Sequence, residues 1–150
     1  MITVLFDGLC EPGYPGGPRN PGGVATYGYA IYKDGSSIKK GCRALGEGQG
    51  FTNNVAEFSG LKRALEWLAE QDFNDEILIK GDSMLVINQV NGNWQVKSRT
   101  SRRFVPEIKK LLQGKKTRLQ WIPREENSEA DMLSRVAYKR YLKNKQQNSG

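Results

Sequence analysis

Residues 53–70, NNVAEFSGLKRALEWLAE, carry the clearest secondary-structure signal in the chain. Apolar residues recur there at helical spacing and predict an amphipathic helix with one face in the core. These residues are Leu61, Ala64, Leu65 and Leu68. Glu57 falls on the same face, where a carboxylate is costly unless something compensates its charge. A metal ion would compensate it, and a capping pair with Asn54 is the structural alternative.

Strand patterns lie on both sides of this helix. Before it, residues 2–9, 24–33 and 37–45 predict strands, separated by the Gly/Pro-rich segment 11–23 and by the turn Asp34-Gly35. After it, the predicted order is a strand over 76–81, a short helix from Ser83 to about Val90, a polar connection over 93–103, a helix over 104–113 with Pro106 in its first turn, a strand over 117–122 and a last helix from about Ser128 to Leu142.

The resulting order, β-β-β-α-β-α-α-β-α, predicts an α/β (mixed α+β) fold with a five-stranded mixed sheet and helices on both faces. We expect one domain over 1–142 and a disordered tail over 143–150. If the first strand pairs with the fourth, Asp7 and Asp82 lie at neighbouring carboxyl ends. Open α/β sheets bind their ligands at that edge.

Composition narrows the classes of function. The net charge of +7 favours a polyanionic partner such as nucleic acid, with an anionic membrane surface as the rival. No stretch approaches the roughly 20 apolar residues of a membrane span. The first residues show no secretion signal, so we expect a cytoplasmic protein. Cys10 and Cys42 match no metal-ligand spacing and are predicted to be free thiols, with one disulfide as the alternative.

Four acidic residues stand where a predicted strand ends or a predicted helix begins: Asp7, Glu57, Asp82 and Asp131. Each has a structural explanation alone, as a turn residue or as part of a helix cap. Together they suit a two-metal site. Clustered carboxylates repel one another, divalent cations relieve that repulsion, and two ions roughly 4 Å apart can promote phosphodiester hydrolysis.

The absence of histidine removes several other chemistries. It excludes histidine-based zinc sites, Ser-His-Asp hydrolysis and imidazole acid–base catalysis. The GxxxxGK[ST] phosphate loop is also missing. Carboxylate–metal chemistry is therefore the hydrolytic mechanism that the sequence favours.

Four segments together resemble the signature blocks of type 1 ribonuclease H, in the right order over about residues 1–140. They are Phe6-Asp7-Gly8, Thr52-Asn53-Asn54-Val55-Ala56-Glu57, Gly81-Asp82-Ser83 and Glu126-Asn127-Ser128-Glu129-Ala130-Asp131. Asn20-Pro21-Gly22-Gly23 resembles the first loop of that family. The short loop 122–127, which lacks the histidine of many bacterial members, resembles a compact archaeal-like branch.

The resemblance implies a ribonuclease H-like fold and endonucleolytic cleavage of the RNA strand in RNA–DNA hybrids, leaving 5′-phosphate and 3′-hydroxyl ends. It also implies that Asp7, Glu57, Asp82 and Asp131 are catalytic and hold two Mg²⁺ ions, with Mn²⁺ as a substitute. Arg124 is a candidate for part of the role of the missing histidine, and the alternative is a surface salt bridge with Glu125 or Glu126.

The implied substrate contacts are Gly8, Cys10, Glu11, Asn20, Gly22, Gly23, Thr52, Asn53, Asn54 and Ser83. Val55 replaces a phosphate-binding arginine of some members, and Met84 a frequent glutamine. Independently of the family, Lys97 and Arg99 begin the densest basic stretch, which continues to Arg103 and suits phosphate contacts.

Trp94, beside this stretch, is a candidate for packing on a sugar of the DNA strand, or else covers the short helix. Trp67 and Trp121 are expected in or near the core. The resemblance implies an RNA–DNA hybrid as the partner, with double-stranded RNA as a further possibility, and the chain is expected to be a monomer. The rival functions are a non-catalytic hybrid-binding module and a DNA nuclease of the same fold, resolvase-like or integrase-like.

Overall fold

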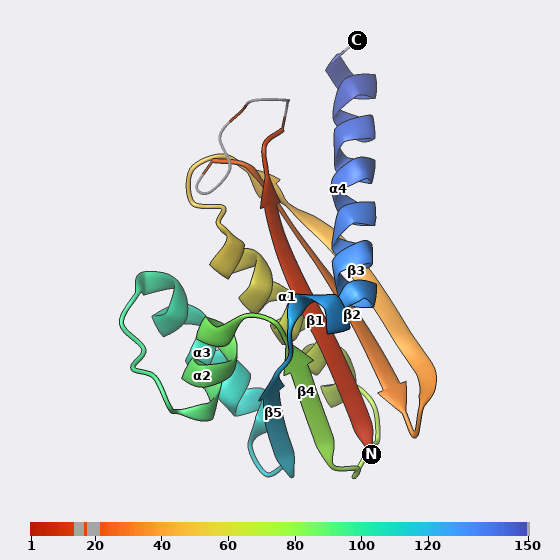
Figure 1. The fold of residues 1–150 in the computed structure, drawn as a ribbon, viewed down its shortest axis with the longest axis vertical. Helices are drawn as coiled ribbons and strands as arrows, with labels where there is room; N and C mark the ends of the chain where they lie inside the picture. Colours follow the sequence, from red (N-terminus) through yellow and green to blue (C-terminus); the bar gives the residue numbers. More distant parts are fainter. Residues whose placement is uncertain (14–16, 18–21, 150) are drawn as a thin grey trace.

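The computed structural model describes residues 1–13, 17 and 22–149 of the chain. Within these residues, five strands form one mixed sheet in the order β3-β2-β1-β4-β5 (Figure 1). The strands are β1 (Ile2–Glu11), β2 (Val24–Lys33), β3 (Ser36–Glu47), β4 (Ile77–Gly81) and β5 (Thr117–Trp121). The first three form an antiparallel meander, and β1, β4 and β5 run parallel. This is the predicted fold class.

Helices cover both faces of the sheet, as predicted. They are α1 (Asn53–Ala69), α2 (Met84–Asn91), α3 (Arg99–Leu112) and α4 (Ser128–Ser149), with a short 3-10 turn η1 (Arg124–Glu126) before α4. Helix α1 packs on β1 and β2 and is flanked by α3, whereas α4 crosses β2, β1 and β3 on the other face (Figure 1). No described helix combines the length and the apolar composition that crossing a membrane requires.

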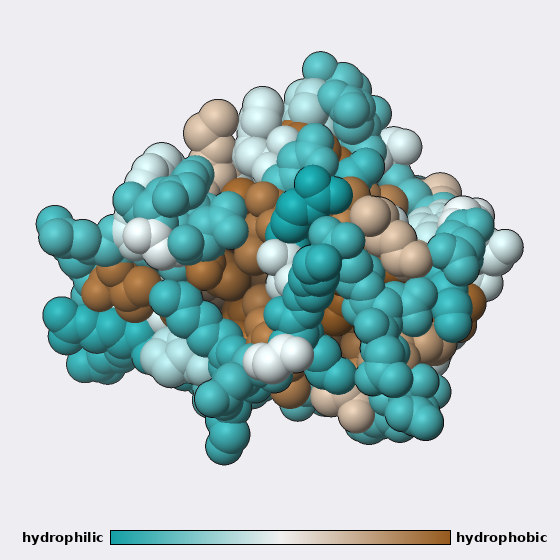
Figure 2. All heavy atoms as spheres, turned by 90° about the horizontal axis from the view of Figure 1, so that it is seen from below, coloured by the Kyte–Doolittle hydropathy of each residue, from teal (hydrophilic) through white to brown (hydrophobic). Residues whose placement is uncertain are grey.

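The main core lies between the sheet and α1. Alternate residues of β1 are fully buried there, and the rings of Phe58 in α1 and Phe104 in α3 stack with centroids 5.5 Å apart. Where β4 and β5 begin, apolar and polar surfaces meet, as Figure 2 shows from below. A cavity at the start of β4, between Ile2 and Leu112, measures only about 20 Å³. It is too small for a ligand, since a cavity of this volume holds about one water molecule.

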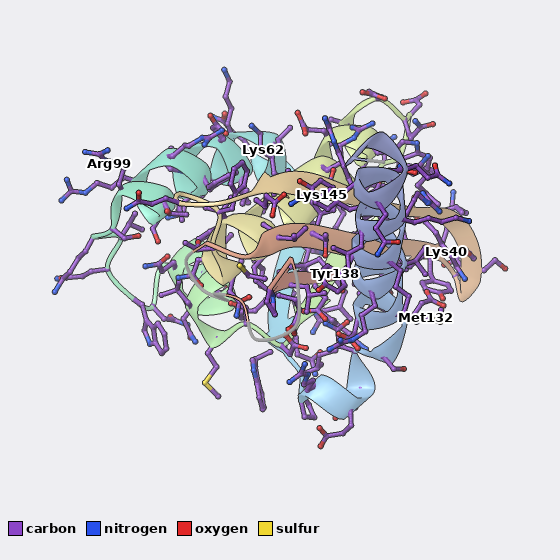
Figure 3. All side chains as sticks on the ribbon, turned by 90° about the horizontal axis from the view of Figure 1, so that it is seen from above. Lys40, Lys62, Arg99, Met132, Tyr138 and Lys145 are labelled. Carbon is purple, nitrogen blue, oxygen red and sulfur yellow. The ribbon has the colours of Figure 1, made fainter. Side chains whose placement is uncertain are left out.

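Helix α4 is tied to the meander at both ends. Near its start, Glu129 accepts hydrogen bonds from the Tyr32 hydroxyl and, at 3.2 Å, from Lys40 of β3. Toward its end, Lys145 pairs with Glu47 at the end of β3. Figure 3 shows Lys40 and Lys145 at these two places, seen from above. The anchors fix the start of α4, and with it the position of Asp131.

Several predicted boundaries need correction. Strand β1 continues to Glu11, so Asp7 lies inside a strand and not in a turn. Helix α4 is helical through Ser149, beyond its predicted end at Leu142. The extent of the domain, the disordered tail, the monomeric state and the cytoplasmic location stay predictions. Neither Cys10 nor Cys42 forms a disulfide among the described residues.

Helix α3 begins at Arg99, five residues before its predicted start at residue 104, and Pro106 lies in its interior. The cause is Ser98, whose side chain caps the helix by accepting a hydrogen bond from the Ser101 amide at 3.0 Å. Residues 99–103 are therefore helical and not part of a connection. The strong helix cap and the buried residues that follow it outweigh the proline.

A buried polar network joins α2 to the start of α3. The Gln89 side chain is only 4% exposed; it donates to the Gln95 carbonyl at 3.0 Å and accepts from the Ser101 hydroxyl at 2.6 Å. Ser101 in turn accepts from the Ser98 hydroxyl at 2.9 Å. Since each group has a partner, the network orders the connection that carries Trp94 and Lys97.

Gln89→Ala should destabilise the protein by about 1–3 kcal/mol, because the Gln95 carbonyl loses its side-chain donor and the Ser101 hydroxyl loses the acceptor of its hydrogen. Urea unfolding measures this loss, and hydrogen exchange should quicken in the segment 94–99. Gln120→Ala, at an exposed position of β5, is the matched control. Equal stability of the two variants would contradict a structural role for the network.

Candidate active site

A polar cavity of about 550 Å³ opens where the pairing of β1 and β4 ends. It is lined by Asp7, Gly8, Leu9, Cys10, Glu11, Asn53, Glu57, Asp82, Trp121, Arg124 and Asp131. All four carboxylates singled out in the sequence therefore lie around one cavity. Its walls come from β1, the start of α1, the end of β5, η1 and the start of α4.

The sheet register places Asp7 and Asp82 side by side. Phe6 and Gly81 are the last paired residues of β1 and β4, and the residue that follows each of them in the chain is an aspartate. The predicted adjacency of the two carboxyl ends is confirmed. Beyond this point β1 continues without β4 beside it, and its residues 8–11 form one wall of the cavity.

Two glycines allow helices to approach the sheet here. A Cβ atom at Gly8 would lie 2.3 Å from the backbone nitrogen of Glu57, so α1 reaches β1 only because this position has no side chain. A Cβ atom at Gly28, the β2 partner of Asp7, would lie 2.4 Å from the Ala130 carbonyl oxygen of α4. Gly8 thus brings Glu57 to the site, and Gly28 brings Asp131.

The helix caps are formed by other residues than the acidic ones. Thr52 caps α1 by accepting from the Val55 amide at 3.2 Å, and Ser83 caps α2 by accepting from the Val86 amide at 3.2 Å. The structural explanations of Glu57 and Asp82 as capping residues are therefore wrong. Their carboxylates face the cavity instead.

Three carboxylates form a compact group. One oxygen each of Asp7, Glu57 and Asp82 lies within 4.8 Å of the others, a spacing that can hold a metal ion. Asp131 lines the same cavity outside this group, and its Oδ2 accepts from Arg135 Nε at 3.2 Å. The structure thus brings three members of the predicted quartet together and leaves the fourth at the rim.

Burial and mutual repulsion raise the pKa values of this group. Burial, followed by the charge of Asp82, raises the pKa of Asp7 to about 7. Burial also raises the pKa of Glu57 well above its ordinary value, with Asp7 as the next cause. The pKa of Asp82 is raised by burial, against the opposing effects of Asn127 and Arg124. A divalent cation would relieve all three perturbations.

Asn127 is a site residue that we did not assign from the sequence. Its side chain is fully buried, and its Nδ2 donates to the Phe6 carbonyl at 2.8 Å and to Asp82 Oδ2 at 3.4 Å. It therefore joins β1, the end of β4 and the start of α4. The sequence signal that could have identified Asn127 is its position in the segment 126–131, which resembles the fourth signature block. Asn127 Oδ1 and Glu57 Oε2 are buried side-chain atoms without a hydrogen-bond partner among the described residues.

Arg124 and Trp121 form the wall opposite β1. Arg124 is exposed and lies close enough to Asp82 for its charge to lower the pKa of that carboxyl group. No ion pair links it to Glu125 or Glu126 among the described residues, so the salt-bridge alternative is not supported. Trp121 is 41% exposed, and the expectation that it belongs to the core is wrong. Trp67 packs against the core, as expected.

The predicted substrate contacts fall into three groups. Gly8, Cys10, Glu11 and Asn53 line the cavity. Thr52 and Ser83 are helix caps beside it, while Gly22, Gly23 and Asn54 are not among its described lining residues. Asn20 lies outside the described residues. Trp94, Lys97 and Arg99 are exposed around the start of α3, away from the cavity lining, and Figure 3 shows Arg99 projecting from the molecule.

Asp7→Asn should stabilise the metal-free protein near neutral pH. The folded form keeps Asp7 protonated up to about pH 7, whereas the unfolded chain loses that proton near 3.8, so stability falls as the pH rises between these values. Since one unit of pKa corresponds to about 1.4 kcal/mol, the variant should gain a few kcal/mol at about pH 8 and almost nothing at about pH 4. Urea unfolding with a chelator measures the difference. Asp72→Asn, at an exposed position, is the control, and a gain independent of pH would contradict the assignment.

Comparison with known proteins places this geometry in a family. The model of the family described as reverse transcriptase-like matches residues 23–137. Ribonuclease HI of Halobacterium salinarum is 34% identical over 137 residues, which are 91% of this chain, and the chain spans 63% of the length of that relative.

Solved structures agree. The crystal structure of RNase H1 from the halophilic archaeon Halobacterium salinarum superposes with a TM-score of 0.77 at 31% identity, covering 92% of this chain and 97% of that one. LC11-RNase H1, solved in complex with an RNA/DNA hybrid, gives a TM-score of 0.80 at 29% identity, covering 95% and 99%. The chain therefore belongs to the reverse transcriptase-like family and, within it, to the type 1 ribonucleases H.

Proposed function

We propose that this protein is an endoribonuclease that hydrolyses the RNA strand of RNA–DNA hybrids with divalent metal ions, leaving 5′-phosphate and 3′-hydroxyl ends. The observation that carries the proposal is the group of Asp7, Glu57 and Asp82, whose oxygens meet within 4.8 Å at a cavity large enough for a nucleotide. Likeness to RNase H1 proteins, one of them solved with a hybrid, supports it.

The donor atoms fit hard divalent cations. The group offers only carboxylate oxygens, which suit Mg²⁺ and Mn²⁺ better than softer metals. Glu57 Oε2, buried without a partner, is a free ligand atom, and Asp131 is near enough to Asp7 and Asp82 to raise the pKa of both. Two bound ions would activate a water and stabilise the charge that develops on the leaving 3′-oxygen.

The wall formed by β1 suits recognition of an RNA strand. Past Phe6 the backbone of β1 has no β4 residue beside it, and residues 8–11 line the cavity together with Asn53, so the main-chain and amide groups of this wall lie within reach of a bound strand. Such groups can bond a 2′-hydroxyl, which both donates and accepts and which DNA lacks. The exposed Lys97 and Arg99 suit the phosphates of the other strand, in keeping with the net charge of +7.

Arg124 takes over part of the role of the histidine that many bacterial members of the family carry in this loop. Its guanidinium lies in the cavity wall, where it can hold a phosphate oxygen by charge-assisted hydrogen bonds. Because arginine stays protonated, Arg124 would act through electrostatic attraction and not by transferring a proton.

Asp82→Asn should abolish cleavage and keep the fold and hybrid binding. Loss of groups that only support metal ligands typically costs 10–100-fold, so loss of a ligand should cost more than about 100-fold. A labelled-hybrid assay with Mg²⁺ or Mn²⁺, with and without chelator, measures the rate, and Asp72→Asn is again the control. Full activity of Asp82→Asn would refute the ligand assignment.

The same assay separates the rival functions. A wild-type protein that binds the hybrid but never cuts it would be a binding module. Equal cleavage of an all-DNA duplex would indicate a resolvase-like or integrase-like nuclease, and a double-stranded RNA substrate tests that further activity.

Arg124→Ala should lower kcat by about 10–100-fold, because it removes a hydrogen bond between charged groups that is worth about 1.5–3 kcal/mol. It should also shift the acidic limb of the kcat profile to higher pH, since Arg124 lowers the pKa of Asp82. Arg124→Lys should restore part of the rate. Arg118→Ala, an exposed arginine of β5 paired with Glu76, is the matched control, and an unchanged rate and profile for Arg124→Ala would contradict the role.

A further inference from the structure

Trp121 stands at an unusual place for a tryptophan. It is the last residue of the edge strand β5, opposite Gly81 of β4, and 41% of its surface is exposed. Of the apolar side chains that line the cavity in the described part of the chain, that of Trp121 is exposed, whereas those of Leu9 and Cys10 are buried. An apolar ring at the edge of a carboxylate site needs a physical reason to lie there.

The ring nitrogen of Trp121 already makes a hydrogen bond within the protein. Trp121 Nε1 donates to the main-chain carbonyl of Asp82 at 3.1 Å, and the adjoining Ile122 amide donates to the Gly81 carbonyl at 2.9 Å. The side chain of Asp82 has a separate partner, since its Oδ2 accepts a hydrogen bond from Asn127 Nδ2 at 3.4 Å. The segment 81–82 is thus fixed by β5 through its backbone and by Asn127 through its side chain.

The hydrogen bond also orients the ring. The indole has a single donor and no further polar group, so with Nε1 bound to Asp82 its remaining exposed surface is hydrocarbon. Because β4 lies between β1 and β5, this surface stands across the carboxylates from the wall of residues 8–11. A strand lying over Asp82 would therefore pass between the wall of residues 8–11 on one side and an aromatic face on the other.

We propose that Trp121 is a substrate-contact residue that also positions Asp82; this rests on the proposed function. In a duplex the bases are stacked inside, so a strand presents its sugars and phosphates to the protein. The indole packs against the sugar next to the scissile phosphate, and its Nε1 hydrogen bond keeps the Asp82 carboxylate in place. The two roles use different parts of one side chain, so they can be separated by substitution.

Two variants separate them. Trp121→Phe keeps an aromatic face and loses the donor to Asp82, so the KM for a hybrid should stay within about 2-fold while kcat falls and half-maximal activity needs more Mg²⁺. Trp121→Leu loses the aromatic face as well, and its KM should rise by about 5-fold, the lower limit of the range for a base stacked on an aromatic ring, because a sugar offers a smaller contact than a base. Trp67→Phe, on the core side of α1, is the control. Circular dichroism and thermal unfolding verify that the variants fold.

A second measurement does not depend on cleavage. In a Trp67→Phe, Trp94→Phe, Asp82→Asn protein, Trp121 is the only tryptophan left, and the carbonyl it binds is still present. Titration with a short RNA–DNA hybrid should change its fluorescence.

An unchanged KM in Trp121→Leu would overturn the proposed contact, and so would a tryptophan fluorescence that stays the same when the hybrid binds. An unchanged kcat and Mg²⁺ dependence in Trp121→Phe would overturn the positioning role. A wild-type protein that binds but never cuts would instead refute the proposed function, and the fluorescence would still test the contact.

Discussion

The repulsion among Asp7, Glu57 and Asp82 is the constraint around which this end of the molecule is organised. Three carboxylates whose oxygens lie within 4.8 Å, two of them buried, oppose folding unless protons or cations balance their charge. Folding nevertheless brings the three carboxylates together, because the strands and helices that carry them are anchored by packing elsewhere. The stability of the core is thus used to hold a local arrangement that would be unfavourable alone.

The anchoring is distributed over the whole fold. The parallel pairing of β1 with β4 fixes two of the acids, and the missing side chain of Gly8 lets α1 add the third. Helix α4 reaches the same place because Gly28 admits it and because Glu129 and Lys145 tie it to the meander. A shift of any of these elements would separate the carboxylates without touching them.

Much of this could be predicted from the sequence because periodicity and position carry it. Strand β2 was predicted with its observed bounds, and α1 to within one residue, since both have strong patterns. The adjacency of Asp7 and Asp82 followed from placing two strands side by side. The start of α3 was missed because a capping serine outweighed the breaking signal of Pro106. The exposure of Trp121 was missed because composition does not reveal which strand lies at the edge of a sheet.

Asn127 could not be assigned a role from the sequence, because its partners, the Phe6 carbonyl and Asp82, are distant along the chain. Its amide is a donor beside three acids, and this has a consequence for the chemical ageing of the protein. Deamidation would exchange the donor for another anion facing Asp82 Oδ2 and so break the link between β1 and the start of α4. Deamidation begins when the following main-chain nitrogen attacks the side-chain amide carbon, and the burial of Asn127 and its two hydrogen bonds restrain the rotation that this attack requires. The packing that shapes the site therefore also protects it over the lifetime of the molecule.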